Sequence, residues 1–214
     1  MRIAVIGGTG YTGENIVREA ASRGHVVTSF SRNLPSASIE NVNYKTGDAS
    51  DTAAVAEAVA GAEVIISTLS PRGALAESLR AVDAEIAQLA AKSGARLLVV
   101  GGFSSLRPAN GEPRFAETGE IPEEYAAEAR TMNDILGDLL AGATDGLEWT
   151  FFSPAQSYGS YAPGEALGKY RVGDEIAFFD EDGNSAISGA DFALAIVDEA
   201  EAGQYKNAHI SIAY

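Results

Sequence analysis

The amino-acid sequence predicts a doubly wound α/β fold, in which helices cover both faces of a mostly parallel β-sheet. Three observations favour it. Short, almost wholly apolar runs alternate with amphipathic helical patterns along most of the chain. The first run, residues 3–6, ends in glycines at positions 7, 10 and 13 and passes directly into a helical pattern at residues 14–23. At 214 residues, with 46% hydrophobic and 21% charged residues, the chain has the size and composition of one globular domain.

The glycine-rich turn after the first strand is the strongest functional signal in the sequence. Gly7 makes the tight turn, Gly10 lets the backbone approach a pyrophosphate, and Gly13 lets the helix pack closely on the strand. The N–H groups and the partial positive charge of the helix N-terminus then face the phosphates. We therefore predict a dinucleotide cofactor in a Rossmann-like fold. The hydroxyls of Thr9 and Thr12 either contact the phosphates or cap the helix.

The second predicted strand, residues 26–31, is rich in β-branched and aromatic residues. In dinucleotide-binding folds the residue at the end of this strand meets the adenosine ribose. An acid there accepts from the 2′-hydroxyl, and an arginine pairs with a 2′-phosphate. The residue here is Arg32, and no acid occurs between Val26 and Ser38. The sequence therefore favours NADP, with NADPH preferred over NADH; the alternative is an exposed arginine without this role.

A short third strand at residues 42–45 leads to a helix at residues 53–59. Either Asp51 or Ser50 caps this helix. Asp48 precedes the cap and lies at the carboxyl end of a strand, where ligands bind in open α/β sheets. Asp48 is therefore a candidate ligand-binding residue.

The middle of the chain continues the alternation of strands and helices. Residues 63–67 and 96–100 form buried strands, and an amphipathic helix at about residues 75–92 lies between them. Residues 106–122 form a polar loop, rich in proline and glycine, that is too long for a simple connection; a helix at residues 123–140 follows. Loops of this length are commonly functional, so we expect this one to form a wall of the substrate pocket.

Beyond Pro154 the alternation weakens, and short strand-like pieces lie among glycines. We expect residues 154–188 to form a small substrate-side lid within a single domain that spans residues 1–214. The remaining predicted elements are strands at residues 148–152, 170–172, 176–179 and 209–213 and a helix at residues 191–202.

Charge and composition exclude several classes of function. The 15 Lys and Arg residues face 30 Asp and Glu residues, which gives a formal net charge of -15. Such a surface repels nucleic acid, although local N–H groups and one arginine still suffice for cofactor phosphates. The chain has no cysteine, which excludes disulfides, thiol catalysis and thiolate metal sites.

The two histidines and the first residues carry no sign of a metal site or a membrane. We interpret His25, in the turn before the second strand, and His209, at the start of the last strand, as solvated residues. We predict no metal site. The first apolar run is too short for a signal peptide or a membrane span, so we expect a cytoplasmic protein without a membrane partner.

Several short motifs along the whole chain together resemble one family. They are Gly7-Gly-Thr-Gly-Tyr-Thr-Gly13, Gly47-Asp48, Gly101-Gly-Phe-Ser-Ser-Leu106, Pro122-x-x-Tyr125, Trp149-Thr150, Ser153-Pro154-Ala155, Gly168-x-Tyr170, Gly183-Asn184-Ser185-x-Ile187-Ser188 and Asp191-x-Ala193-x-Ala195 with Asp198-Glu199. With these motifs the chain resembles the atypical short-chain dehydrogenase/reductases. More narrowly, it is similar to a bacterial group within the NAD(P)H-binding, NmrA-like proteins. The members of this group are provisionally named NADH-flavin reductases.

This resemblance implies a cofactor site along the carboxyl edge of the sheet. From the pyrophosphate to the nicotinamide, the implied cofactor-binding residues are Gly7, Thr9, Gly10, Tyr11, Thr12, Arg32, Asp48, Thr68, Ser70, Gly102, Ser153, Pro154 and Ala155. Ser104, beneath the reacting ring, and Tyr125 are the candidate catalytic residues. Phe103 stands where the family pattern has a small residue, and it narrows the expected pocket.

The sequence departs from the wider superfamily at the catalytic pair. Better-known members use Tyr-x-x-x-Lys, in which the lysine lowers the phenol pKa from about 10 toward neutrality. Here alanine occupies the position of the lysine, at Ala129, four residues after Tyr125. Alcohol dehydrogenation by that mechanism is disfavoured. A role of Tyr125 as a hydrogen bonder or stacking platform and a role as an ordinary helix-face residue both stay open.

These observations predict an NADPH-dependent reductase of a planar acceptor such as FMN, FAD or a quinone, because stacking and proximity supply most of that catalysis. Candidate pocket aromatics, which equally suit core packing, are Phe103, Phe115, Tyr125, Tyr158 and Tyr161. One alternative is an NmrA-like regulator that binds NADP(H) without turnover. The third is a nucleotide-sugar epimerase or dehydratase, which needs the tyrosine-lysine pair. We expect a monomer or a homodimer.

Overall fold

One eight-stranded sheet, in the order β3-β2-β1-β4-β5-β6-β8-β7, forms the centre of the computed structural model, which describes residues 1–214. Every neighbouring pair is parallel except β7 with β8. This order confirms the doubly wound α/β fold. The strands are β1 (Arg2–Ile6), β2 (Val26–Ser31), β3 (Val42–Thr46), β4 (Val64–Ser67), β5 (Arg96–Val100), β6 (Trp149–Pro154), β7 (Arg171–Gly173) and β8 (Ala208–Ala213).

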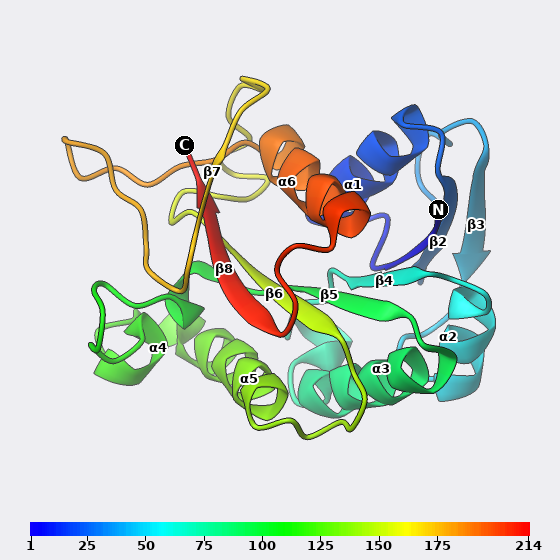
Figure 1. The fold of residues 1–214 in the computed structure, drawn as a ribbon, viewed down its shortest axis with the longest axis horizontal. Helices are drawn as coiled ribbons and strands as arrows, with labels where there is room; N and C mark the ends of the chain where they lie inside the picture. The colour runs from blue at the N-terminus through cyan, green and yellow to red at the C-terminus, as the bar shows by residue number, and fades with distance from the viewer.

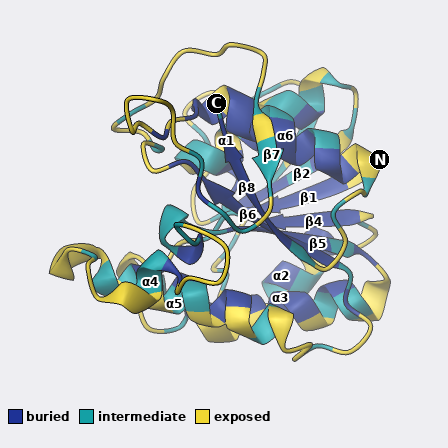
Figure 2. Ribbon diagram, turned by 60° about the vertical axis from the view of Figure 1, so that its left-hand side comes forward, coloured by how far each residue is buried: buried dark blue, intermediate teal, exposed yellow.

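Helices cover both faces of the sheet and divide the apolar core into two layers (Figure 1). One layer packs α1 and α6 on the sheet, and the other packs α2, α3 and α5 on the opposite face. The inner strands are buried apart from their first residues, and most exposed residues lie on the outer helix faces and in the loops (Figure 2). The helices are α1 (Tyr11–Ser22), α2 (Thr52–Val59), α3 (Leu79–Ser93), α4 (Phe115–Thr118), α5 (Glu123–Leu140) and α6 (Gly189–Ala202), with short 3₁₀ turns η1 (Gly73–Leu75) and η2 (Phe103–Ser105). No helix combines the length and the apolar character that crossing a membrane requires.

The strand register brings the exits of the parallel strands to one edge of the sheet. Ile6, the last residue of β1, lies opposite Phe30 of β2 and Ser67 of β4. Val100, at the end of β5, lies opposite Phe152 of β6. The loops that leave β1, β2, β4, β5 and β6 therefore share the edge at which open α/β sheets bind their ligands.

Three predicted elements differ from the structure. Residues 176–179 are not a strand: only Ile176 forms a single bridge, with Arg107, while Phe178 lies under the Arg171 guanidinium, 4.6 Å from the ring centroid. The apolar residues there contact both β7 and the segment around Arg107, and they form no continuous ladder with either. The helix predicted from residue 75 begins at Leu79, because residues 73–75 form η1. The loop predicted at residues 106–122 contains the short helix α4.

Candidate cofactor and substrate site

The glycine turn between β1 and α1 leaves open space in front of Gly10. Gly7 has φ +85°, in the left-handed region that favours glycine, and its N–H donates to the Phe30 carbonyl at 2.8 Å. A Cβ on Gly13 would lie 2.2 Å from the Gly7 oxygen, so α1 packs directly on the turn. A Cβ on Gly10 would meet only the Gly7 oxygen, at 3.3 Å.

The first turn of α1 presents unsatisfied donors to this space. The N–H groups of Tyr11, Thr12 and Gly13 have no acceptor within the protein. Gly10 is the N-cap residue and makes no side-chain cap, so neither Thr9 nor Thr12 caps the helix. The Thr12 hydroxyl instead lies 2.7 Å from the Tyr158 hydroxyl. Free N–H groups at a helix N-terminus behind an uncrowded glycine fit a pyrophosphate.

At the end of β2, Arg32 is exposed and forms no ion pair or hydrogen bond. Asp48, across the loop after β3, accepts from the backbone N–H and the hydroxyl of Ser50 at 2.9 and 2.8 Å. These bonds, and to a lesser degree the charge of Arg32, lower the pKa of Asp48. Asp51, not Ser50, caps α2, because its carboxylate accepts from Ala53 and Ala54 at 3.0 and 3.1 Å. Arg32 and Asp48 therefore share the end of the edge where the adenosine is predicted.

At the other end of the edge, the predicted residues differ in burial and in whether their side chains are already hydrogen-bonded within the protein. The Thr68 hydroxyl donates to the Ile6 carbonyl at 2.9 Å and supports Gly7. Ser70 is exposed, Ser104 is half-buried, and neither hydroxyl has a protein partner. A Cβ on Gly102 would meet nothing within 4 Å. The predicted residues at the end of β6 are Ser153, Pro154 and Ala155, all of which are buried.

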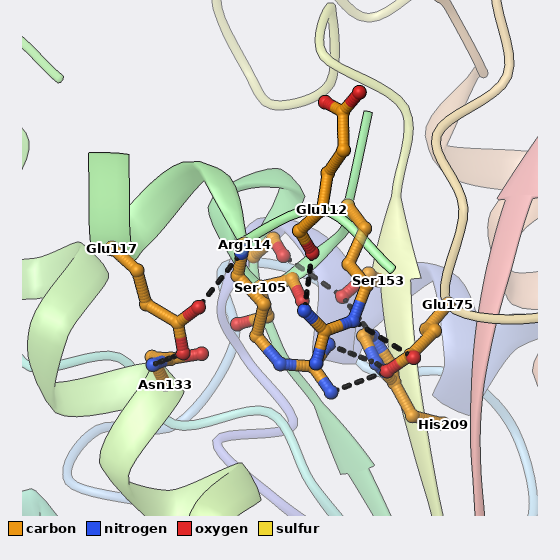
Figure 3. A network of polar contacts seen from close by, with 10 residues as sticks. Ser105, Glu112, Arg114, Glu117, Asn133, Ser153, Glu175 and His209 are labelled. Carbon is orange, nitrogen blue, oxygen red and sulfur yellow. Dashed lines mark hydrogen bonds and ion pairs between the residues drawn. The ribbon is translucent and has the colours of Figure 1, made fainter. Parts of the chain in front are cut away.

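A buried polar network that the sequence did not predict holds the loop after β5 (Figure 3). The Ser153 hydroxyl donates to the Gly102 carbonyl at 2.8 Å and lies 2.9 Å from His209 Nε2. His209 Nδ1 lies 3.0 Å from the guanidinium of Arg114, which also binds the Ser105 carbonyl and pairs with Glu175. The network thus joins the loop before α4, strands β6 and β8, and residue Glu175 of the segment after β7.

The direction of these hydrogen bonds determines what the network does chemically. Arg114 only donates, so His209 Nδ1 accepts and Nε2 carries the proton that it donates to Ser153. Burial, assisted by the charges of Arg114 and Arg107, lowers the pKa of His209 to about 3. A neutral histidine with this tautomer does not take the Ser153 proton. Ser153 and His209 are therefore not a nucleophile and its base, but fix the Gly102 carbonyl.

The interpretation of both histidines as solvated was wrong. His209 is 7% exposed, because β8 is covered on both faces. His25 is also mostly buried, with its Nε2 2.8 Å from Glu201. A histidine inside an apolar run typical of a two-face-buried strand is the sequence signal that indicates burial. No such local signal points to Arg114.

Phe103 directly follows Gly102 and packs against two further phenylalanines from other segments. The rings of Phe103 and Phe115 are stacked, with centroids 4.9 Å apart at 23°, and Phe179 meets Phe103 edge-on at 6.1 Å. Phe179 is 40% exposed. We call Phe103, Phe115 and Phe179 the aromatic wall. It combines two of the predicted aromatics with Phe179, from the segment after β7.

Tyr125 is separate from the aromatic wall. It lies in the first turn of α5, is 54% exposed, and its phenol hydroxyl has no hydrogen-bond partner. Ala129, one turn later, is buried. The cation in the surroundings of Tyr125 is Arg72, which is held by both oxygens of Glu128 at 2.7 and 2.9 Å. The structure therefore offers this phenol no free ammonium or guanidinium.

The segment between β6 and α6 reaches across to the glycine turn. Besides the contact of Tyr158 with Thr12, the Tyr11 hydroxyl donates to the Pro163 carbonyl at 3.3 Å. At the far side, Asp191 of α6 accepts from the backbone N–H groups of Leu167 and Gly168 at 2.7 and 2.9 Å. The segment is thus tied both to α6 and to residues predicted to contact the pyrophosphate.

Solved structures with this fold span the chain from end to end. A Burkholderia pseudomallei protein provisionally named an exported protein is 40% identical, with a TM-score of 0.86 and 100% of both chains covered. A Bacteroides thetaiotaomicron protein provisionally named an epimerase is 31% identical, with a TM-score of 0.87 over 100% of this chain and 96% of that one. A Streptococcus pneumoniae TIGR4 protein provisionally named an NADH-flavin reductase is 32% identical, with a TM-score of 0.86 over 100% and 99%.

The family comparison agrees with the geometry of the glycine turn. A model of a family described as NAD(P)H-binding matches residues 7–202, which begin at Gly7 and end with the last residue of α6. The match includes the glycine turn, the strand exits and the segment between β6 and α6. The chain belongs to the NAD(P)H-binding family.

Proposed function

We propose that this protein is an NADPH-dependent oxidoreductase that passes hydride to a planar acceptor such as a flavin or a quinone. The observation that carries the proposal is the aromatic wall. It includes Phe103, the residue after Gly102, and so lies at the edge of the sheet that also carries the glycine turn. Bound NADPH would supply the hydride. Flat aromatic rings beside a glycine with open space in front of its Cα suit stacking of an extended ring system.

The residues of this chain would bind and orient the two reactants. The N–H groups of Tyr11, Thr12 and Gly13 would receive the pyrophosphate, and Arg32 would pair with a 2′-phosphate. The hydrogen-bond chain from Arg114 to Gly102 would keep the loop after β5 in place beneath the acceptor. Residues 154–188 would act as the lid and exclude water.

The scarcity of acid-base groups favours a planar acceptor over an alcohol. No free cation accompanies the Tyr125 phenol, because Arg72 is held by Glu128, and His209 donates its Nε2 proton to Ser153. A flavin or quinone takes its proton from solvent, so proximity suffices. Ser104, with its free hydroxyl, and Tyr125 would contribute hydrogen bonds at most.

The same scarcity favours a second candidate, a regulator that binds NADP(H) without turnover. A nucleotide-sugar epimerase or dehydratase ranks third, because its chemistry needs the tyrosine-lysine pair that Ala129 removes. The two leading candidates share the cofactor site and differ only in turnover.

The first test compares cofactor binding with turnover. We expect NADPH to bind more tightly than NADH, and NADPH absorbance to fall steadily after FMN, FAD or a quinone is added. Arg32→Ala should weaken NADPH binding about 10- to 100-fold with little effect on NADH, since it removes a charge-assisted phosphate contact. Arg130→Ala is the matched control, because Arg130 is also exposed and without an ion pair but lies on α5.

Three outcomes separate the candidates. Binding with turnover supports the reductase. NADPH binding without turnover of any planar acceptor supports the regulator instead. If neither nucleotide binds at about 1 mM, a concentration at which ordinary enzyme sites are filled, both candidates fail.

A further inference from the structure

A hollow separate from the candidate cofactor site lies on the face of the sheet opposite α1 and α6. It is bounded by α3, α5 and the turn that precedes β6. Its volume is about 100 Å³, and it shares no residue with the candidate cofactor site. Its walls are mostly apolar. They include Val99, Ile135, Leu139, Leu147 and Trp149.

One buried carboxyl interrupts the apolar walls. Asp83 of α3 is 5% exposed and lines the hollow. Its Oδ1 accepts from the Ser67 hydroxyl at 2.8 Å, whereas Oδ2 is buried without a partner. Arg80, at the mouth, does not supply one, because Asp138 binds its guanidinium at 2.7 Å. A buried polar atom without a partner costs about 1–3 kcal/mol, so a donor would bind favourably once the wall of the hollow shifts enough to uncover Oδ2, which solvent does not reach in this structure.

The charge state of Asp83 narrows the class of that donor. Burial raises the pKa of Asp83 to about 7, against the opposing effect of the Ser67 hydrogen bond. A weak base that titrates near neutrality can share one proton with such a carboxyl, and the pair then buries no net charge. Asp134 and Asp138, at or near the mouth, further disfavour anions.

The volume sets the size of the ligand. An apolar cavity of about 150 Å³ in another protein holds a benzene ring, so about 100 Å³ suits a single ring of at most about that size. We propose that the hollow between α3 and α5 is a second small-molecule site, which takes a single-ring nitrogen base of the imidazole type and binds its ring nitrogen at Asp83.

The test uses 4-methylimidazole as the probe and Trp149, the only tryptophan, as the reporter, with titration calorimetry in parallel. We expect saturable binding with a dissociation constant of about 1 mM, the range open to so small a ligand. 3-Methylfuran, a ring of the same size without a basic nitrogen, should bind at least about tenfold more weakly.

Two variants and a control separate recognition from mere filling of space. Asp83→Leu removes the acceptor and should weaken 4-methylimidazole binding at least about tenfold. Ala87→Leu, from the cavity wall, should block both ligands. Asp134→Asn removes one charge near the mouth, on a residue that does not line the hollow, and should leave binding unchanged.

The proposal is overturned if 3-methylfuran binds as tightly as 4-methylimidazole, or if Asp83→Leu binds both as the native protein does. The hollow is then only an apolar cavity. It is also overturned if neither Trp149 emission nor heat changes up to about 10 mM probe. None of these outcomes depends on NADPH binding.

Discussion

At the scale of single residues, the glycines of the β1–α1 turn carry different constraints. A Cβ on Gly13 would lie 2.2 Å from the Gly7 oxygen and 2.7 Å from the Gly8 Cα, both of them rigid backbone atoms. A Cβ on Gly10 would meet one atom at 3.3 Å and otherwise face open space. The fold therefore requires Gly13, whereas Gly10 is required only by something that approaches the turn from outside.

Two alanine substitutions test this distinction. Gly13→Ala should lower the free energy of unfolding by about 1–3 kcal/mol, because the added methyl group pushes α1 off the turn. Gly10→Ala should cost less, about 1 kcal/mol at most, because alanine is a poorer N-cap residue than glycine and its methyl group meets only the Gly7 oxygen at 3.3 Å. It should weaken NADPH binding at least about tenfold, because the methyl group occupies the space of the pyrophosphate. Urea unfolding and fluorescence titration measure the two effects. NADPH binding by Gly10→Ala as tight as that of the native protein would contradict the assignment of the site.

Residue-level prediction succeeded where the constraint is local and failed where it is not. The glycine spacing is a property of seven consecutive residues, and the structure shows the geometry that it predicts. The contact of Arg114 with His209 joins residues that are 95 positions apart. Nothing near either residue in sequence specifies its partner, so the network around Gly102 appears only in three dimensions.

At the scale of elements, one ion pair with a buried arginine joins the segment between β5 and α5 to the segment between β6 and α6. Arg114, just before α4, is 4% exposed and pairs with Glu175, just after β7. Arg107 also reaches Glu175, at 2.8 Å, but its side chain is 24% exposed. The two segments therefore dock on each other through one buried and one partly exposed arginine, and through backbone hydrogen bonds of Arg107 with Glu175 and Ala177 at 2.8 and 2.9 Å.

Replacing each arginine with methionine tests this docking. Arg114→Met should lower the free energy of unfolding by about 2–3 kcal/mol and speed protease cleavage in residues 107–122 and 155–188, because it leaves His209 Nδ1 and the Ser105 carbonyl without their donor. Arg107→Met, the control, should cost less than about 1 kcal/mol, as for other partly exposed pairs. Equal losses for both variants would show that burial of Arg114 is not what holds the segments.

Regular elements were the most predictable part of the fold. The predicted strand at residues 96–100 and the predicted helix at residues 123–140 have the bounds of β5 and α5. The strand is a continuous apolar run that both helix layers cover, whereas the helix has a long apolar stripe that packs on one face of the sheet. The apolar residues at 176–179 serve several neighbours at once, Arg107, Arg171 and Phe103 among them, so their alternation does not indicate a strand.

At the scale of the whole molecule, two buried titratable groups affect stability in opposite directions. Asp83 has its pKa raised to about 7, so the folded protein binds more protons than the unfolded chain between about pH 4 and 7, and stability falls as pH rises. His209 has its pKa lowered to about 3, so the unfolded chain binds more protons between about pH 3 and 6.5, and stability rises with pH. The two contributions oppose each other between about pH 4 and 6.5.

Removing either group should therefore reveal the other. Relative to the native protein, Asp83→Leu should gain up to about 1.4 kcal/mol of unfolding free energy for each pH unit from pH 4 to 6.5. His209→Gln should lose a similar amount over the same range. Urea unfolding at several pH values measures both differences. Curves that run parallel to that of the native protein would show that neither group is buried in its stated protonation state.

The strand order described above also determines how the chain must assemble in time. Ile3 pairs with Val64, Val64 with Arg96, and Thr150 with Ala208, so no pair of neighbouring strands closes through a tight hairpin. Each pairing waits for a long crossover, which makes folding slow for a domain of this size. During synthesis on the ribosome, β1 emerges first, yet one of its edges stays open until β4 has been made. Between those two moments the unpaired edge of β1 is a site at which the nascent chain can aggregate.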